Sequence, residues 1–347
     1  MRKSTILFFL LFSCVIATAQ NGKEPVKVTD MLKIKSIGGV TISNDGNKAA
    51  FTVTVIEPDG DNKWEYKYVN QIWMVNTDGS SSPKQITGKE SSSQPAFSPD
   101  GKQLAFVRLA DGKPQIFLIP LDGGEASQLT KYKYGAGTPK WSPDGKQIVF
   151  SSNIGLKEML KDSVLNPSHE IPSWPFEKPG FDKNQQLLSS SAKADPDGSI
   201  EEIRSYLENN VADKKAKVVN KLSFQDETDV STEVRFNHFF VQSLQPGATP
   251  VDITKGFYSF NSADFTPDGK QLILSGDIDS MQNADRSLES EIFLVNNDGT
   301  HLNKLLGEEG KTFGSAKISP SGKWLAFQYG TTSFVNVPAL GIMPLNG

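Results

Sequence analysis

The histidines are the first side chains to consider for chemistry. The chain has three, His169, His238 and His301. Histidine acts as a general acid or base when it stands beside a nucleophile or a metal in a defined motif. These three lie in a proline-rich stretch, in an apolar run and beside an Asp-Gly turn, and none belongs to such a motif. We therefore predict surface or packing roles for all three.

Carboxylates are the second group of candidates. Glu201 and Glu202 are adjacent, and such a pair can hold the amino terminus of a peptide. Ser199 and Glu202, however, have the spacing of a capping box, which predicts a helix over residues 197–210 and a capping role for Glu202. Two pairs of aspartates lack the ligand spacing of a calcium loop: Asp195 with Asp197, and Asp277 with Asp279.

The compact catalytic motifs are missing from this sequence. It has no GxSxG, HGG or HExxH segment, no P-loop and no dinucleotide fingerprint. The only cysteine, Cys14, lies in an apolar run at the start, so the rest of the chain has no thiol for catalysis or metal binding. We predict no catalytic residue, no metal site and no cofactor, and we assign no binding residue.

A repeated ten-residue pattern organises the chain. Its copies are FSPDGKQLAF at 97–106, WSPDGKQIVF at 141–150, FTPDGKQLIL at 265–274, ISNDGNKAAF at 42–51 and ISPSGKWLAF at 318–327. In the first copy Pro99 presets φ, Asp100 bonds to nearby backbone and Gly101 supplies a positive φ. The pattern predicts a tight turn followed by a strand, with the aspartates as turn formers and not as metal ligands.

A second pattern follows the first. It reads QIWMVNTDG at 71–79, QIFLIPLDGG at 115–124, HFFVQSLQPG at 238–247 and EIFLVNNDG at 291–299, and Gln-Ile-Thr, Gln-Leu-Thr or Asp-Ile-Thr closes the first three. Two hairpins per repeat give four antiparallel strands, which is one blade of a β-propeller. The 44 residues from Asp100 to Asp144 fit a blade. The predicted fold is an all-β propeller of about five four-stranded blades.

The third blade is predicted to contain an insert. Asp144 and Asp268 are 124 residues apart, so a hidden blade or an insertion must lie between them. We place an insertion at about 154–235, with a Pro-rich segment at 166–180, the helix described above and a strand at 218–224. An insert of this kind is a natural place for a ligand or partner surface.

The last blade is predicted to be incomplete. LGIMPLNG at 340–347 aligns with IFLIPLDG at 116–123, which is followed by the fourth strand of its blade. Either that strand is missing here and leaves an open apolar edge, or the lead-in at 26–35 supplies it and closes a ring of five blades. We favour the missing strand.

The first residues have the pattern of a secretion signal. Arg2 and Lys3 precede an apolar run and the small residues Ala17-Thr18-Ala19. We expect a signal peptide at 1–19, a propeller at 20–347 and export to the periplasm or the medium; lipidation of Cys14 is the alternative. No stretch is long and apolar enough to remain as a membrane span. The net charge of −4 offers no basic footprint for nucleic acid.

The repeats resemble the WSPDG-type propeller repeats of TolB-like proteins and of the prolyl oligopeptidase family, S9. DMLKIK at 30–35 and DRSLESEIFLV at 285–295 are similar to the acylaminoacyl-peptidase-like members, as is HFFVQSLQPGATPVDITKG at 238–256. The resemblance implies a propeller, usually with more than five blades, followed by an α/β-hydrolase domain with catalytic Ser, Asp and His. Nothing in this chain matches that hydrolase domain, so no catalytic residue is carried over.

Two functions compete on this basis. The first is the propeller portion of an exported prolyl oligopeptidase-type serine peptidase, which binds or gates peptide substrates and is inactive without its hydrolase domain. The second is a self-sufficient TolB-like module that binds proteins. A lectin-like propeller is a third, without a visible sugar-binding pattern. The expected partner is a peptide or protein, with a separate or missing hydrolase domain in the first case.

The signal-peptide assignment predicts the mature amino terminus. Cleavage after Ala19 leaves Gln20 as the first residue, because Ala17 and Ala19 fit the small-residue rule. Mass spectrometry of the exported protein measures this end directly. An acylated Cys14 would instead show that the protein is a lipoprotein.

Overall fold

The computed structural model describes residues 26–60, 65–88, 90–172, 191–209, 225, 230–231, 233–278, 288–333 and 336–345. The expected signal peptide at 1–19, the expected strand at 218–224 and most of the Pro-rich segment lie outside these ranges.

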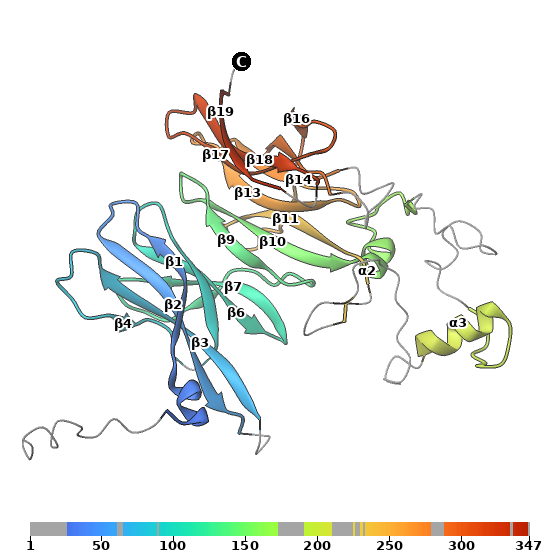
Figure 1. Ribbon diagram of the computed structural model, residues 1–347, viewed down its shortest axis with the longest axis horizontal. Helices are drawn as coiled ribbons and strands as arrows, with labels where there is room; N and C mark the ends of the chain where they lie inside the picture. Colours follow the sequence, from blue (N-terminus) through green and yellow to red (C-terminus); the bar gives the residue numbers. More distant parts are fainter. Residues whose placement is uncertain are drawn as a thin grey trace, which may run out of the picture.

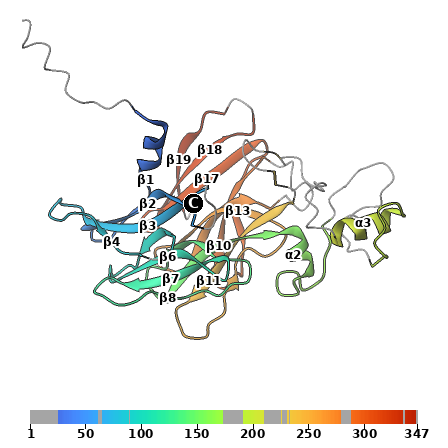
Figure 2. The same ribbon diagram turned by 90° about the horizontal axis from the view of Figure 1, so that it is seen from below.

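Five antiparallel sheets follow one another along the chain as blades (Figures 1 and 2). Blade 1 holds β1 (Ser36–Ile42), β2 (Lys48–Pro58), β3 (Tyr66–Asn76) and β4 (Lys84–Gln85). Blade 2 holds β5 (Ser92–Phe97), β6 (Gln103–Ala110), β7 (Lys113–Pro120) and β8 (Ser127–Gln128). Blade 3 holds β9 (Gly137–Trp141), β10 (Gln147–Gly155), β11 (Arg235–Ser243) and β12 (Val251–Asp252).

Blade 4 holds β13 (Ser259–Phe265), β14 (Gln271–Asp277), β15 (Glu291–Asn296) and β16 (Asn303–Leu306). Blade 5 holds β17 (Lys311–Ile318), β18 (Trp324–Thr331) and β19 (Ala339–Pro344), so its sheet has three strands among the described residues. The predicted fold class is confirmed, with five sheets of three or four strands among the described residues.

The ten-residue pattern forms the turn between the first and second strands of each blade. In blade 3, Asp144 Oδ1 accepts hydrogen bonds from Ser142 Oγ (2.6 Å) and from the amide of Lys146 (3.1 Å). Ser142 Oγ in turn accepts from the amide of Gln147 (2.9 Å), and Gly145 has φ +69°. The Ser142 hydroxyl, more than the Lys146 amide, holds the pKa of Asp144 below its usual range. The turn role predicted for the aspartates is confirmed.

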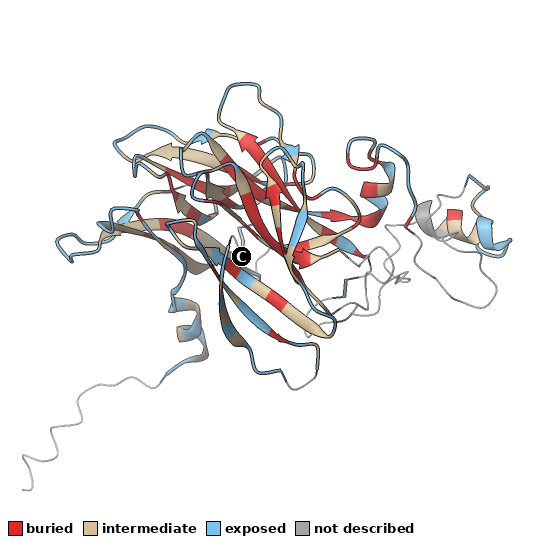
Figure 3. Ribbon diagram, turned by 90° about the horizontal axis from the view of Figure 1, so that it is seen from above, coloured by how far each residue is buried: buried red, intermediate tan, exposed pale blue. Residues whose placement is uncertain are grey.

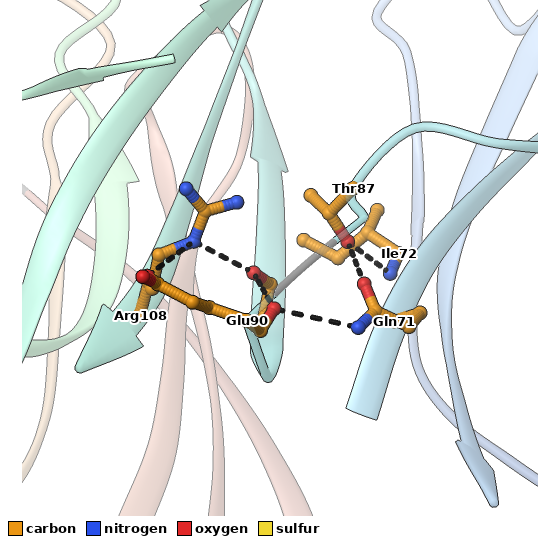
Figure 4. Close-up of polar contacts among 6 residues, drawn as sticks. Gln71, Ile72, Thr87, Glu90 and Arg108 are labelled. Atoms are coloured by element: carbon orange, nitrogen blue, oxygen red, sulfur yellow. Dashed lines mark hydrogen bonds and ion pairs between the residues drawn. The ribbon is translucent and has the colours of Figure 1, made fainter. Parts of the chain in front are cut away.

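A buried threonine fixes the register of the outer hairpin. In blade 1, Thr87 Oγ1 accepts from the amide of Ile72 (2.9 Å) and donates to Gln71 Oε1 (2.7 Å; Figure 4). Thr130 repeats both bonds in blade 2, with Ile116 and Gln115. These threonines close the Gln-Ile-Thr and Gln-Leu-Thr segments of the sequence, so the motif ties the short fourth strand to the third.

His238 occupies in blade 3 the position that Gln71 and Gln115 occupy in blades 1 and 2. Its side chain is fully buried, and Nδ1 lies 3.1 Å from Asp252 Oδ2. The amide of Phe239 donates to Thr254 Oγ1 (2.9 Å), as in the other blades. The ring also stacks against Phe240. His238 is thus part of the blade's internal packing.

The core consists of four hydrophobic clusters, each shared by two consecutive blades; buried residues run along the strands in red in Figure 3. Ala50 packs with Leu104 across blades 1 and 2, and Ala105 with Ile148 across blades 2 and 3. The other two clusters join blades 3 and 4 and blades 4 and 5. None of the four, within the described ranges, joins blade 5 back to blade 1.

The insert of blade 3 leaves between β10 and β11, and its helices lie to one side of the sheets in Figures 1 and 2. It contains α2 (Leu156–Lys161) and α3 (Ile200–Asn209). The predicted capping box is present, since the Ser199 amide donates to Glu202 Oε2 (2.8 Å) and the Glu202 amide to Ser199 Oγ (3.4 Å).

The lead-in does not supply a strand to blade 5. It forms a 3₁₀ helix, η1 (Val28–Lys33), which contacts β2 of blade 1. The alternative of a ring closed by residues 26–35 is therefore wrong. The segment folds as a helix because Asp30 caps its start, accepting from the amide of Lys27 (2.8 Å). Of the helices described, none has the length and apolar character needed to cross a bilayer.

Removal of a turn aspartate should destabilise the fold, and Ca²⁺ should not change the stability of either the wild type or the variant. Asp144→Ala loses the bonds to Ser142 and Lys146 and should cost on the order of 1 kcal/mol. Asp144→Ser is the matched control, because blade 5 builds the same turn with Ser321, whose Oγ lies 3.1 Å from Ser319 Oγ. Thermal melts with and without Ca²⁺ measure both effects. Calcium stabilisation of the wild type alone would identify the aspartates as ligands.

Candidate functional site

The first strands of the blades carry irregularities that regular sheets lack. Each of the five has a shift of register in its pairing with the second strand. Near these shifts Gln94, Thr138 and Ser315 have positive φ, although none is glycine. Gln94 Oε1 accepts from the amide of Thr138 (2.6 Å), which links blades 2 and 3 at this level. Bulges re-aim side chains and favour binding surfaces, so the first strands are candidates to present groups to a ligand.

Three of the first strands place charged residues against one another. Lys140 of β9 contacts Asp264 of β13 (Nζ–Oδ1, 2.9 Å) and donates to the carbonyl of Ala263 (2.8 Å). Lys317 of β17 pairs with the other oxygen of Asp264. One carboxylate thus faces two ammonium groups contributed by the blades on either side. This Lys140–Asp264–Lys317 cluster has an excess positive charge in a chain whose net charge is −4.

The three residues of this cluster occupy one position of the repeat. Each directly precedes the first residue of the ten-residue pattern; Thr41 and Ala96 stand there in blades 1 and 2. The cluster was not expected from the sequence, although the alternation of Lys, Asp and Lys at a fixed offset from the turn is a readable signal for it.

An apolar cavity of about 480 Å³ lies beside Lys317 on blade 5. Its lining consists of Lys317, Ile318, Ser319, Trp324, Ala326 and Ile342. The cavity belongs to a face of the sheet on which nothing packs among the described residues. We call this the open face of blade 5; it comprises Lys317, Trp324, Ala326, Gln328, Leu340 and Ile342, which alternate along their strands.

The open face contrasts with the same face of the other blades. A row across the first three strands faces the next blade, and its second-strand members, Ala50, Ala105, Val149 and Ile273, are 0–1% exposed. In blade 5 the row is Lys317, Ala326 and Ile342. Ile342 is 73% exposed and Leu340 on the same strand 80%. Blade 1 is uncovered on its other face, the one away from blade 2, where Ile42 is 59% exposed.

A polar cavity of about 390 Å³ lies where blades 3, 4 and 5 meet, at the end of the blades from which the insert leaves. Arg235, Asp277 and Glu289 are its charged lining residues. Glu289 Oε1 accepts from the amide of Gly310 (2.6 Å), so one carboxylate oxygen is already held by backbone. The mixture of charges suits polar peptide groups more than an apolar ligand.

The base of the insert is anchored by a buried carboxylate. Asp162, just after α2, has a side chain only 2% exposed, and its Oδ2 accepts from Lys133 Nζ (2.6 Å) and Tyr134 Oη (2.8 Å). Burial opposes its ionisation, but the bonds from Lys133, Tyr134 and the amide of Val164 outweigh burial and hold the pKa of Asp162 below its usual value. Burial and the Asp162 bond raise the pKa of Tyr134. The insert therefore starts from a fixed point on blades 2 and 3.

The remaining candidates from the sequence lie apart from one another. His169 is in the insert, His238 in β11 and His301 in the turn after β15. Glu202 caps α3. Asp277 lines the polar cavity, whereas Asp279 lies outside the described residues. Over the described part of the chain, no three His, Cys, Asp or Glu side chains gather as a metal site would require. The absence of a catalytic residue stays a prediction.

Residues 42–160 match the family model of the TolB beta propeller domain. The matched stretch starts at the last residue of β1 and ends in α2, so it covers blade 1 without its first strand, blade 2 and the first half of blade 3. The chain folds as a TolB-like β-propeller. No curated protein sequence matches it.

Several solved structures are similar to this chain, and those with a TM-score above 0.5 share its fold. An acylaminoacyl peptidase in complex with Z-Gly-Gly-Phe-chloromethyl ketone is 14% identical, with 92% of this chain and 40% of the peptidase covered and a TM-score of 0.54. The acylaminoacyl peptidase of Pyrococcus horikoshii is 16% identical, with 88% and 37% covered and a TM-score of 0.52. A putative TolB from Agrobacterium tumefaciens is 16% identical, with 90% and 78% covered and a TM-score of 0.48. The chain thus spans 40% or less of the two peptidases' length.

The Asp162 anchor predicts a pH-dependent loss of stability. The pKa of Asp162 in the folded state lies below its unfolded value of about 3.9. The carboxylate therefore stabilises the fold at pH values above about 3.9. This stabilisation is lost as the pH falls through the lower, folded-state pKa. Asp162→Asn should cost about 2 kcal/mol at pH 7 and flatten the melting temperature between pH 5 and 3. The exposed Asp122→Asn is the control. An unchanged pH profile in Asp162→Asn would contradict the assignment.

Proposed function

We propose that this chain is the propeller portion of an exported prolyl oligopeptidase-type serine peptidase, close to the acylaminoacyl peptidases, and that it binds or gates peptide substrates for a hydrolase domain outside the present sequence. One observation carries the proposal. Blade 5 exposes an apolar face whose counterpart is buried against a following blade in blades 1 to 4. A self-sufficient ring would cover that face.

The open face weighs against the competing module. Monomeric proteins seldom expose large contiguous apolar patches unless these are interaction surfaces. Trp324, Leu340 and Ile342 form such a patch, and Ile42 of blade 1 is exposed at the other end of the series. A propeller with further blades buries both, and S9 propellers usually have more than five blades. The fold shared with two acylaminoacyl peptidases supports this reading.

Peptide binding fits the end of the propeller that carries the insert. The polar cavity with Arg235, Asp277 and Glu289 lies there, and Asp162 anchors the insert beside it. Carboxylates and a guanidinium group can hold the charged and amide groups of a peptide. Bond cleavage needs a nucleophile, a base and an oxyanion hole, for which this chain has no motif. We assign these groups to the hydrolase domain.

The second candidate is a TolB-like module that binds another protein, and the family match over residues 42–160 favours it. In that case the open face is the protein-binding surface itself. The two candidates differ in what the gene encodes after codon 347. Further propeller repeats followed by HGG and GxSxG segments would establish the peptidase. An unrelated sequence, or a stop codon, would refute it and leave the module.

The proposal predicts how activity depends on length. Residues 20–347 alone should not hydrolyse acyl-peptide esters or amides above background, because they have no activated nucleophile. The polypeptide extended through the downstream hydrolase domain should hydrolyse them. Its Ser→Ala variant at the GxSxG serine is the matched control. Turnover by residues 20–347 that one Ser→Ala change abolishes would overturn the assignment.

A further inference from the structure

We propose that blades 1 and 2 together bind a carboxylate carried by a peptide, at the end of their interface. The binding surface, which we call the Arg108 surface, comprises Arg108, Asn70, Tyr66 and Tyr68. Arg108 lies near the end of β6, and the insert leaves from the end of the equivalent strand β10, so both belong to the same end of the blades. The inference deepens the proposed function: it takes from it that the ligand is a peptide, and it adds the chemical group that is selected.

The guanidinium group of Arg108 is held in a fixed position. Its Nε donates to Ser92 Oγ (3.1 Å), and the Ser92 hydroxyl, which is buried, donates its own proton to the carbonyl of Glu90 (3.0 Å). The Cζ atom of Arg108 lies 5.0 Å from the ring centre of Phe106 and 5.3 Å from that of Phe117. The side chain is 18% exposed. These contacts aim the two terminal nitrogens in a defined direction.

The terminal nitrogens of Arg108 are available for a ligand. In the part of the chain that the structure describes, neither Nη1 nor Nη2 has a hydrogen-bond acceptor. The Glu90 carboxylate lies beside Nε, with its Oε2 3.7 Å away, which is too long for a hydrogen bond. Figure 4 shows both terminal nitrogens pointing away from Glu90. A guanidinium fork matches the two oxygens of a carboxylate, and such a ligand would satisfy a largely buried charge.

Arg235, at the same end of blade 3, is engaged differently. Its Nε donates to Asn153 Oδ1 (3.2 Å), and its Nη2 donates to the carbonyl of the same residue. One edge of that guanidinium group is therefore fastened to its own blade. Arg108 keeps its whole fork free, which makes it the better candidate for two-point binding of a carboxylate.

Asn70 supplies a second donor beside Arg108. The backbone amide of Asn70 donates to Ser91 Oγ (3.1 Å), and Ser92, next in sequence, accepts from Arg108, so a short segment joins the two residues. The side-chain oxygen of Asn70 accepts from Thr54 Oγ1 (2.7 Å). The Nδ2 hydrogens of Asn70 can therefore reach another acceptor, such as a peptide carbonyl.

Two exposed tyrosines extend the surface past the end of blade 2. Tyr66, Tyr68, Asn70 and Ile72 alternate along β3 and share one face, and Ile72 belongs to the same hydrophobic cluster as Leu104 of blade 2. Strands β2 and β3 have 11 residues each, whereas β6 and β7 have 8, and Figure 1 shows the longer hairpin projecting. Tyr66 is 52% exposed and Tyr68 72%. Tyrosines beside an arginine are typical of binding hot spots, and these two can cover an apolar side chain next to the carboxylate.

Four peptides test the carboxylate site on the chain as exported. The first pair is acetyl-Leu-Phe-Glu-Ala-amide and the same peptide with Gln in place of Glu. The second pair is acetyl-Leu-Phe-Ala-Ala with a free carboxy terminus and its amide. Isothermal titration calorimetry at low salt gives the dissociation constants. In at least one pair the peptide with the carboxylate should bind about tenfold more tightly, as expected for hydrogen bonds to a charged group. The pair that shows the preference identifies the source of the carboxylate.

Two variants with opposite effects assign the preference to Arg108. Arg108→Lys keeps the charge but loses the fork, so the preference should fall to about twofold. Glu90→Gln removes a competing carboxylate and should strengthen the binding of the charged peptide about two- to fivefold, without effect on the neutral one. A purely structural role of Arg108 would instead weaken both peptides of a pair alike.

The aromatic part of the surface is tested separately. Tyr68→Ala should weaken charged and neutral peptides alike, because its ring contacts the apolar side chains that both contain. Leu109→Ala is the matched control, since Leu109 is 59% exposed but points to the opposite face of β6 from Arg108. It should leave all four dissociation constants unchanged.

Each result decides a part of the proposal. Equal affinities within both pairs, or no binding of any of the four peptides, would overturn the carboxylate site. A preference that survives in both Arg108→Lys and Arg108→Gln would overturn the role of Arg108. Equal losses in Tyr68→Ala and Leu109→Ala would overturn the role of the tyrosines. The sequence after codon 347 tests the proposed function independently, so a failure there is distinguishable from a failure of peptide binding here.

Discussion

The fold depends on the burial of blade faces against neighbouring blades. A β-sheet covered on one face only leaves apolar side chains in water, and each blade here relies on its neighbours for cover. The four hydrophobic clusters are shared between blades, so no blade has a core of its own. Stability in such an arrangement is a sum over interfaces, and the first and last blades are the points at which that sum is incomplete.

Polar bonds inside each blade determine which residues reach those interfaces. A shift of one residue in register would turn Ala105 to the face towards blade 1 and Leu104 to the face towards blade 3. The turn of Ser98, Asp100 and Gly101 fixes the inner hairpin, and Thr130 fixes the outer one by bonding Ile116 and Gln115. Each of these bonds is modest in energy, but together they place every apolar row against the next blade.

Much of this architecture could be predicted from the sequence, because it repeats. The five turn patterns located the five blades, and the copy at 318–327 with its truncated partner indicated the incomplete blade. Capping by Ser199 and Glu202 was also readable, since it is a local signal. The competing view that residues 26–35 supply a strand is the part that fails: their alternation breaks at Thr29-Asp30 and Met31-Leu32, and the Asp30 cap makes the segment a 3₁₀ helix on blade 1.

Contacts between distant segments could not be read in the same way. The Asp162 anchor joins Lys133 and Tyr134 of blade 2's exit to the start of the insert, and nothing in the local sequence of Asp162 indicates that it is buried. The polar cavity depends on how blades 3, 4 and 5 are placed around Arg235 and Glu289. Such sites arise from the angle between blades, which a repeat pattern does not encode.

The position of the insert shows how the blade keeps its stability while it carries additional surface. Gly155 and Arg235, 80 residues apart in sequence, are the last partners of an unbroken antiparallel pair between β10 and β11. The insertion therefore replaces only a hairpin loop, and the interfaces on either side of blade 3 remain intact. Because closing a long loop costs little more than closing a short one, the main requirement is a fixed exit, which Asp162 provides. Binding surface can thus change at the ends of the blades while the rows on their faces continue to hold the propeller together.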